Sequence, residues 1–138
     1  MYDTIVIAAA LFSKGETTRD LIEKAKPMLN DGGKLVLVHV LEEVPRYVAP
    51  QIPKEHLTAH QREVQDTLEE LAKSAGDTPC EVVVRSGTPS MGILGTAKEK
   101  KADLIMIASH KPGFSDYFIG STAARVVRHS PISVLVLR

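Results

Sequence analysis

Cysteine, net charge and long hydrophobic runs are all scarce in this sequence. The single cysteine, Cys80, has no partner, so no intramolecular disulfide can form. Seventeen basic residues balance seventeen acidic ones, which leaves no overall attraction to nucleic acid or to an anionic membrane. No apolar run approaches the roughly 20 residues that cross a bilayer. We therefore expect a soluble protein with no nucleic-acid or membrane partner, in which any bound anion is held locally.

The length and the first residues set further expectations. A chain of 138 residues suits one domain, residues 1–138, with its own hydrophobic core. Met1-Tyr-Asp-Thr leads directly into an apolar run, without the basic flank or cleavage site of a secretory signal. Together with the lone cysteine, this predicts a cytoplasmic protein. The chain has no Gly-x-Ser-x-Gly motif, which argues against a hydrolase.

Short runs rich in valine and isoleucine alternate with longer helical patterns, as in parallel strands joined by crossover helices. The five predicted strands are Thr4 to Ala10, Lys34 to Leu41, Cys80 to Arg85, Asp103 to Ser109 and Ile132 to Arg138. Right-handed crossovers leave few topologies, of which we expect the order 3-2-1-4-5. The predicted fold is α/β, a five-stranded parallel sheet with helices on both faces.

Four helices are predicted between these strands. They cover Glu16 to Leu29, Lys54 to Ala75, Thr88-Pro89 through Lys101, and about Ser121 to His129. Pro27 lacks an N–H group, so the first helix should bend or end early. Residues 42–53 contain three prolines and form an irregular stretch, which fits a lid and a plain connection equally well.

The last third of the chain has the order of elements that makes an anion site. A buried strand runs into Ser109-His-Lys-Pro-Gly113, and Gly120-Ser-Thr-Ala then opens the last helix. Vacant N–H groups and the positive end of a helix dipole attract phosphate, and Gly120 lets it approach the backbone. The plainer interpretation is that Gly120 and Ser121 simply cap the helix. In the expected order, the ligand crevice lies beyond the carboxyl ends of strands one and four.

Ile105 to Arg138 closely resembles the C-terminal signature of the universal stress protein family. Three groups of fixed-type residues fall in one register, namely Gly120-Ser121, Val126-Val-Arg-His129 and Val134-Leu-Val136. The resemblance extends over the whole chain, and it is strongest to the F/G-type branch. In that branch a Ser-His-basic-Pro turn, here starting at Ser109, replaces a glycine-rich loop.

The resemblance implies a Rossmann-like fold of the adenine nucleotide alpha hydrolase type. It also implies ATP held without rapid turnover, with or without Mg²⁺, and homodimers paired through the last strand, Ile132 to Arg138. Whether dimers pair into tetramers is left open. Dimerisation is expected on physical grounds too, because an exposed apolar edge strand invites pairing with a second copy.

The nucleotide-binding residues implied by the resemblance are Ala8, Ala10, Val40, Ser109, His110, Lys111, Gly113, Gly120, Ser121 and Thr122. Lys111 would offer a cation to phosphate, and the backbone of Val40 would read adenine. ATP-binding relatives typically carry Pro-x-Asp in the first strand, with the carboxylate bonded to the ribose, where this chain has Ala8, Ala9 and Ala10. The missing charge-assisted bond costs roughly 1.5–3 kcal/mol, or one to two decades in affinity.

Several other residues have structural interpretations. His39 on a buried strand is predicted to be a hydrogen-bonded core histidine. His56, His60 and Glu63 have a spacing that can hold zinc, but no His-Glu-x-x-His motif is present, so no metal site is predicted. Cys80 opens a strand without a basic neighbour and is expected to be packed, not reactive.

The expected function is therefore that of a homodimeric cytoplasmic universal stress protein. It would bind ATP or a related adenine nucleotide as a regulatory ligand in a stress response. It would not be an enzyme, because no general base is evident to activate an attacking water. Two alternatives stay open: a nucleotide-free protein-interaction module of the same fold, and a slow ATPase or autophosphorylating protein with Ser109, Ser121 or Thr122 as acceptor.

Overall fold

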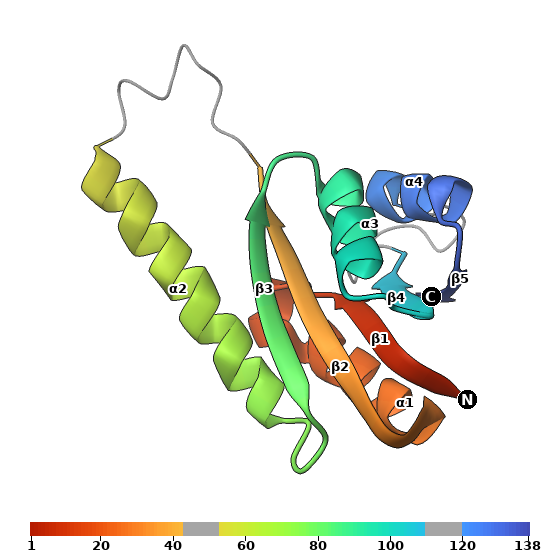
Figure 1. Ribbon diagram of the computed structural model, residues 1–138. Helices are drawn as coiled ribbons and strands as arrows, with labels where there is room; N and C mark the ends of the chain where they lie inside the picture. Colours follow the sequence, from red (N-terminus) through yellow and green to blue (C-terminus); the bar gives the residue numbers. More distant parts are fainter. Residues whose placement is uncertain (43–52, 110–119) are drawn as a thin grey trace.

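The computed structural model describes residues 1–42, 53–109 and 120–138 and places five parallel strands in one sheet (Figure 1). The strands are β1 (Tyr2–Ala8), β2 (Leu29–Leu41), β3 (Cys80–Ser86), β4 (Leu104–Ala108) and β5 (Ser133–Leu137). Their order is β3-β2-β1-β4-β5, and all four neighbouring pairs are parallel. The predicted strand order is confirmed, with β3 and β5 at the two edges.

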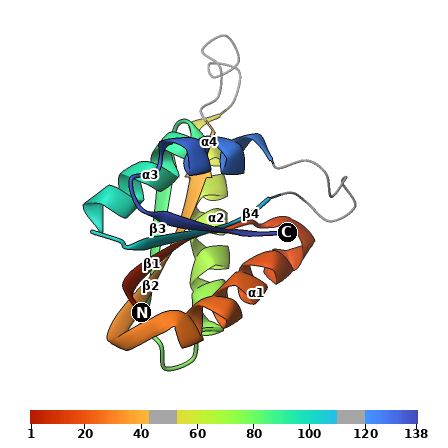
Figure 2. The same cartoon turned by 90° about the vertical axis from the view of Figure 1, so that its right-hand side faces the viewer.

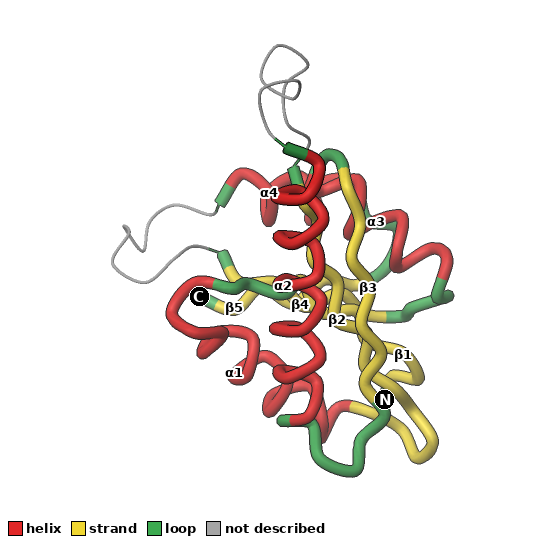
Figure 3. Tube along the Cα trace, turned by 90° about the vertical axis from the view of Figure 1, so that its left-hand side faces the viewer, coloured by secondary structure: helices red, strands yellow, loops and turns green. Residues whose placement is uncertain are grey.

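Helices cover both faces of this sheet, as predicted. They are α1 (Glu16–Ala25), α2 (Lys54–Lys73), α3 (Pro89–Glu99) and α4 (Ser121–His129). Figure 2 shows α3 and α4 above the sheet and α1 below it, and Figure 3 shows α2 on the same side as α1. Two hydrophobic clusters fill the layers, one beneath α1 and α2 and one beneath α3 and α4. The central strands are buried on both faces, which explains their uninterrupted apolar sequences.

The region around Pro27 differs from the predicted helix Glu16 to Leu29. Helix α1 ends at Ala25, and Lys26–Met28 form a single 3₁₀ turn, because proline cannot donate the next helical hydrogen bond. Residues 30–33, which lie between the predicted first helix and the predicted second strand, belong to β2, which begins at Leu29. The pairing of β1 with β2 shifts register there, between Tyr2 and Thr4.

Ion pairs hold α3 against the edge strand β3. Glu81 bonds to Lys100 and lies 3.3 Å from the Nζ of Lys34. Arg85 Nη1 lies 2.9 Å from Glu99 Oε2. The hydrogen bond from Lys100 is the main reason that the pKa of Glu81 is below its ordinary value. These pairs are partly exposed, so they orient α3 more than they stabilise it.

Two glycines let α3 lie close to the sheet. A Cβ on Gly92 would stand 2.5 Å from Cγ2 of Val40, so the first turns of α3 sit directly over the end of β2. The same atom on Gly95 would meet the guanidinium of Arg85 at 3.5 Å, an ordinary contact. The close approach therefore depends on Gly92 and not on Gly95.

Substituting these two glycines separates close packing from helix propensity. Gly95→Ala should raise the free energy of unfolding by about 0.5–1 kcal/mol, because alanine favours the helix. Gly92→Ala should lower it by about 1–3 kcal/mol, because the stiff, buried Val40 cannot move aside. Urea unfolding of both variants measures this, and equal stabilisation by the two would contradict the close packing.

Candidate functional site

Helix α4 begins in direct contact with the residue that follows β4. The N–H of Gly120 donates a hydrogen bond to the carbonyl of Ser109, and a Cβ on Gly120 would stand 2.5 Å from that oxygen. Gly120 has φ −60° and ψ 152°, which any residue can adopt. The glycine is thus required by the approach of two chain segments and not by its backbone angles. Its contact with a phosphate stays a prediction.

The first turn of α4 presents unused backbone donors. The first N–H groups of a helix have no carbonyl within the helix to bond. Among the described residues no side chain caps α4, and the N–H groups of Ser121, Thr122 and Ala123 have no other partner there. Ser121 is exposed and Thr122 is half-buried. The described residues therefore leave the positive end of the helix dipole uncapped, which favours an anion.

The loop after β1 is fixed by hydrogen bonds to its backbone. Thr18 is fully buried in α1, and its Oγ1 accepts from the Ala10 N–H and donates to the Ala10 carbonyl, both at 2.8 Å. The Ala9 N–H donates to the Val38 carbonyl at 2.8 Å. The alanines thus form a rigid, uncharged wall at the end of β1.

His39 helps to hold the same loop. Its Nδ1 lies 3.2 Å from the Ala9 carbonyl, and Nδ1 must be the donor because a carbonyl only accepts. The hydrogen-bonded role predicted for His39 agrees with this contact, although the side chain is half-buried and not fully within the core.

The backbone N–H and carbonyl of Val40 face the side of β2 on which the pairing with β1 has already ended. The carbonyls of Val38 and Leu41 bond the Ala9 and Gly87 N–H groups, so β2 alternates between its two neighbours and Val40 faces β1. Pairing with β1 ends at Val38. Within the described ranges we find no partner for the N–H of Val40. This residue is therefore placed to bond a ligand through its backbone.

The structure brings seven of the ten predicted site residues to one edge of the sheet. Ala8, Ala10, Val40, Ser109, Gly120, Ser121 and Thr122 lie at or just beyond the carboxyl ends of β1, β2 and β4 or at the start of α4. His110, Lys111 and Gly113 lie outside the described residues. The alanines and Val40 meet the start of α4 here only because the strand order places β1 between β2 and β4.

Two buried hydroxyls at this edge were missed in the sequence. Thr18 lies on the apolar stripe of α1 with Leu21, Ile22 and Ala25, and Ser90 lies on that of α3 with Ile93 and Ala97. A polar residue at a stripe position was the available signal, since such a side chain is buried and needs a partner.

Comparison with known proteins agrees with this architecture. The model of the universal stress protein family matches residues 1–138. Universal stress protein G of Escherichia coli O157:H7 is 30% identical over 146 aligned positions that cover 100% of both chains.

Two solved structures of similar fold carry nucleotides. One is a universal stress protein in complex with cAMP, with 24% identity, 99% and 97% of the two chains covered and a TM-score of 0.62. The other is the universal stress protein from Archaeoglobus fulgidus in complex with dAMP, with 20% identity, 99% and 98% covered and a TM-score of 0.62.

Neither a metal centre nor a membrane helix is found in the described parts of the chain. His56 and His60 are exposed on α2, and no group of three His, Cys, Asp or Glu side chains in residues 1–42, 53–109 and 120–138 could hold an ion. None of the helices described is long and apolar enough to span a bilayer.

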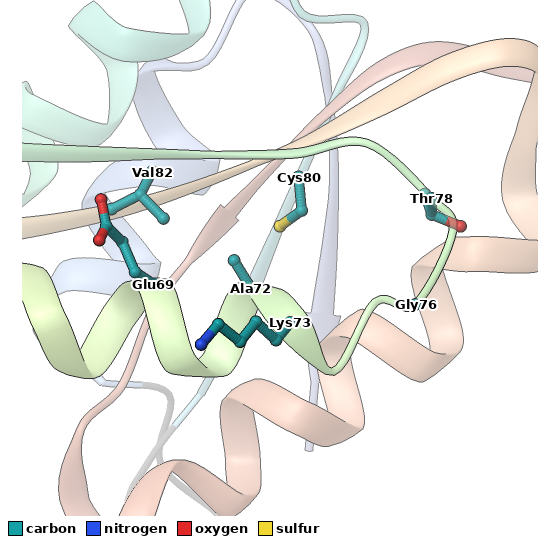
Figure 4. Close-up of a pocket in the computed structure, with 7 residues that line it drawn as sticks. All are labelled: Glu69, Ala72, Lys73, Gly76, Thr78, Cys80 and Val82. Carbon is teal, nitrogen blue, oxygen red and sulfur yellow. The ribbon is translucent and has the colours of Figure 1, made fainter.

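Two hollows lie away from the carboxyl edge. One, of about 370 Å³, lies between the end of α2 and the start of β3 and contains Cys80 (Figure 4). The other, of about 460 Å³, is apolar and is bordered by Lys98 and Lys101 of the α3 end, near Ile132. Burial raises the pKa of the Cys80 thiol from 9.0 to about 11.

Cys80 should therefore react slowly although it faces a hollow. Its thiolate fraction at neutral pH is about a hundredfold lower than that of a thiol with the ordinary pKa, because the shift is about two units. The alkylation rate with iodoacetamide should rise tenfold per pH unit up to about pH 11. A rate that levels off near pH 9 in the folded protein would contradict this, and the urea-unfolded chain serves as the control.

Proposed function

The chain belongs to the universal stress protein family, and we propose that it binds ATP or a related adenine nucleotide as a regulatory ligand at the carboxyl edge of its sheet. The observation that carries this proposal is the start of α4, which no described side chain caps and which is fixed against Ser109. The protein has no net charge, so an anion must be selected by local groups.

The phosphates would lie at the start of α4. Three consecutive N–H groups point there, and the helix dipole adds a partial positive charge. Hydrogen bonds from backbone N–H groups to a charged phosphate are stronger than neutral ones, and no side-chain charge is needed. The described ends of β1 and β4 carry no carboxylate that would repel the phosphates.

The adenine would lie at the end of β2. Adenine carries a ring nitrogen that accepts a hydrogen bond next to an amino group that donates one. The N–H and carbonyl of Val40 both face the open side of β2 and match that pair. Similar proteins in complex with cAMP and dAMP support an adenine nucleotide as the ligand class.

A regulatory role fits better than rapid catalysis. At the described carboxyl edge, segments 8–10, 108–109 and 120–122 contain no titratable side chain. A general base must reach the attacking water, and these residues offer none. Slow hydrolysis or transfer to the hydroxyl of Ser109, Ser121 or Thr122 is the alternative; phosphate release above the buffer rate, or a mass gain after incubation with ATP, would favour it.

We also propose that the protein forms homodimers through β5. The Ser109 N–H bonds the Leu137 carbonyl, so Leu137 and Leu135 bond toward β4, while Val134 and Val136 turn their N–H and carbonyl groups outward. This strand is short, apolar and at the edge of the sheet. A second β5 would satisfy its outward groups.

The phosphate site can be tested by removing one amide without disturbing the helix. Ser121→Pro deletes the N–H at the first helical position, where proline is well tolerated. Gly120 already has the extended ψ of 152° that a residue before proline requires. We expect the wild type to bind Mg-ATP with a dissociation constant below about 1 mM, and the variant to bind about 10- to 100-fold more weakly.

Titration calorimetry measures both affinities, and Ser121→Ala is the matched control because it keeps the amide and loses only the hydroxyl. The control should bind like the wild type. Equal affinity of Ser121→Pro and the wild type would contradict a phosphate site at the start of α4. No heat from the wild type up to millimolar ATP would favour the nucleotide-free interaction module.

The dimer can be tested at an outward-facing residue of β5. Val134→Pro removes an N–H that points away from β4, so the sheet should persist while pairing with a second copy is lost. Light scattering after size exclusion should give a dimer for the wild type and a monomer for Val134→Pro, with circular dichroism unchanged. A wild-type monomer, or a dimer in both, would contradict pairing through β5.

A further inference from the structure

One of the buried polar residues has a hydroxyl without a hydrogen-bond partner among the described residues. Four polar residues are buried in the described parts of the chain: Thr18, Ser90, Thr96 and Ser109. Thr18 bonds both backbone groups of Ala10, and Thr96 donates to the Gly92 carbonyl at 2.8 Å. Ser109 is also engaged. For the Ser90 hydroxyl no partner exists among the described residues.

Ser90 is well inside the molecule. It is the second residue of α3 and only 6% exposed. It precedes Ile93 and Ala97 on the stripe that packs on the sheet. Every side-chain oxygen that is fully shielded from solvent in the described residues has a hydrogen-bond partner. Because the Ser90 hydroxyl has no such partner, its oxygen must touch solvent. A hydroxyl that reaches solvent and has no partner within the described residues is free to bond water or a ligand.

Ser90 lies at the same edge of the sheet as the candidate nucleotide site. Helices α3 and α4 both run back from the carboxyl edge and lie side by side on one face of the sheet (Figure 2). The contact of Gly92 with Val40 places the first turn of α3 over the end of β2, and Gly120 places the start of α4 at the end of β4. The end of β1 lies between them. Ser90 and Ser121 therefore lie in the first turns of neighbouring helices, at the same edge of the sheet.

We propose that the Ser90 hydroxyl is a ligand contact that bonds the sugar hydroxyls of the bound nucleotide. This inference rests on the proposed function. Phosphates at α4 and a base at Val40 leave the sugar over the end of β1, where Ala8, Ala9 and Ala10 have no polar side chain. A sugar hydroxyl there needs a donor or acceptor, and Ser90 supplies both. The ligand thereby completes the bonding of a side chain that the protein leaves unpaired.

The proposal predicts that Ser90 matters for affinity and not for stability. Ser90→Ala should weaken Mg-ATP binding by about tenfold in titration calorimetry, the usual effect of one lost neutral hydrogen bond. Its urea midpoint should equal or exceed that of the wild type, because the hydroxyl has no bond to lose within the protein. With 2′,3′-dideoxy-ATP the wild type and Ser90→Ala should bind equally.

Thr96→Ala is the control, since it removes a buried hydroxyl from the same helix that does have a partner within the protein. It should lower the urea midpoint and leave the affinity for ATP unchanged.

Four outcomes would overturn the inference. If the wild type binds ATP and Ser90→Ala binds it equally well, Ser90 is no contact, and the proposed function stands. If Ser90→Ala loses the same factor for ATP and for the dideoxy analogue, the contact is not with the sugar. If the wild type itself binds the two nucleotides equally, no sugar hydroxyl is recognised. If the wild type binds neither, the inference and the proposed function fail together.

Discussion

The contact between Gly120 and the Ser109 carbonyl sets the position of α4. It joins the first residue before the helix to the first residue after β4, without room for a Cβ between them. Because β4 is buried between β1 and β5, this contact fixes the start of α4 at the carboxyl edge of the sheet. Without this contact the vacant N–H groups of the helix would still exist, but they would not be held beside β1 and β2.

The rest of the site is also built mainly from backbone. Thr18 and His39 use their side chains to fix the loop of alanines, and the N–H of Val40 has no partner among the described residues. The proposed site would recognise shape, a phosphate charge and hydrogen-bonding edges, and it needs few charged side chains. This agrees with the zero net charge of the chain. The chain matches the model of the universal stress protein family over its whole length.

The sequence predicted best those structural features that depend on a single local segment. Buried strands, the proline that ends α1 and the start of α4 all follow from local pattern, and the strand order follows from general rules of handedness. What could not be predicted depends on distances between remote segments. Gly120 is required by a carbonyl oxygen eleven positions earlier, and the hydrogen bonds between Thr18 and Ala10 depend on loop geometry. Residues 30–33 extend β2 at a point where its pairing with β1 shifts register, which no local pattern indicates. In the sequence Ser90 is an ordinary helix residue, and the lack of a partner for its hydroxyl depends on how α3 packs.

The central claim is that the first amides of α4 receive the phosphates of a nucleotide. Amide NMR spectra of ¹⁵N-labelled protein during a titration with Mg-ATP test it most directly. The account predicts that the signals of Ser121, Thr122 and Ala123 shift the most and saturate together with that of Val40. Saturable binding that leaves these amide signals in place would contradict it.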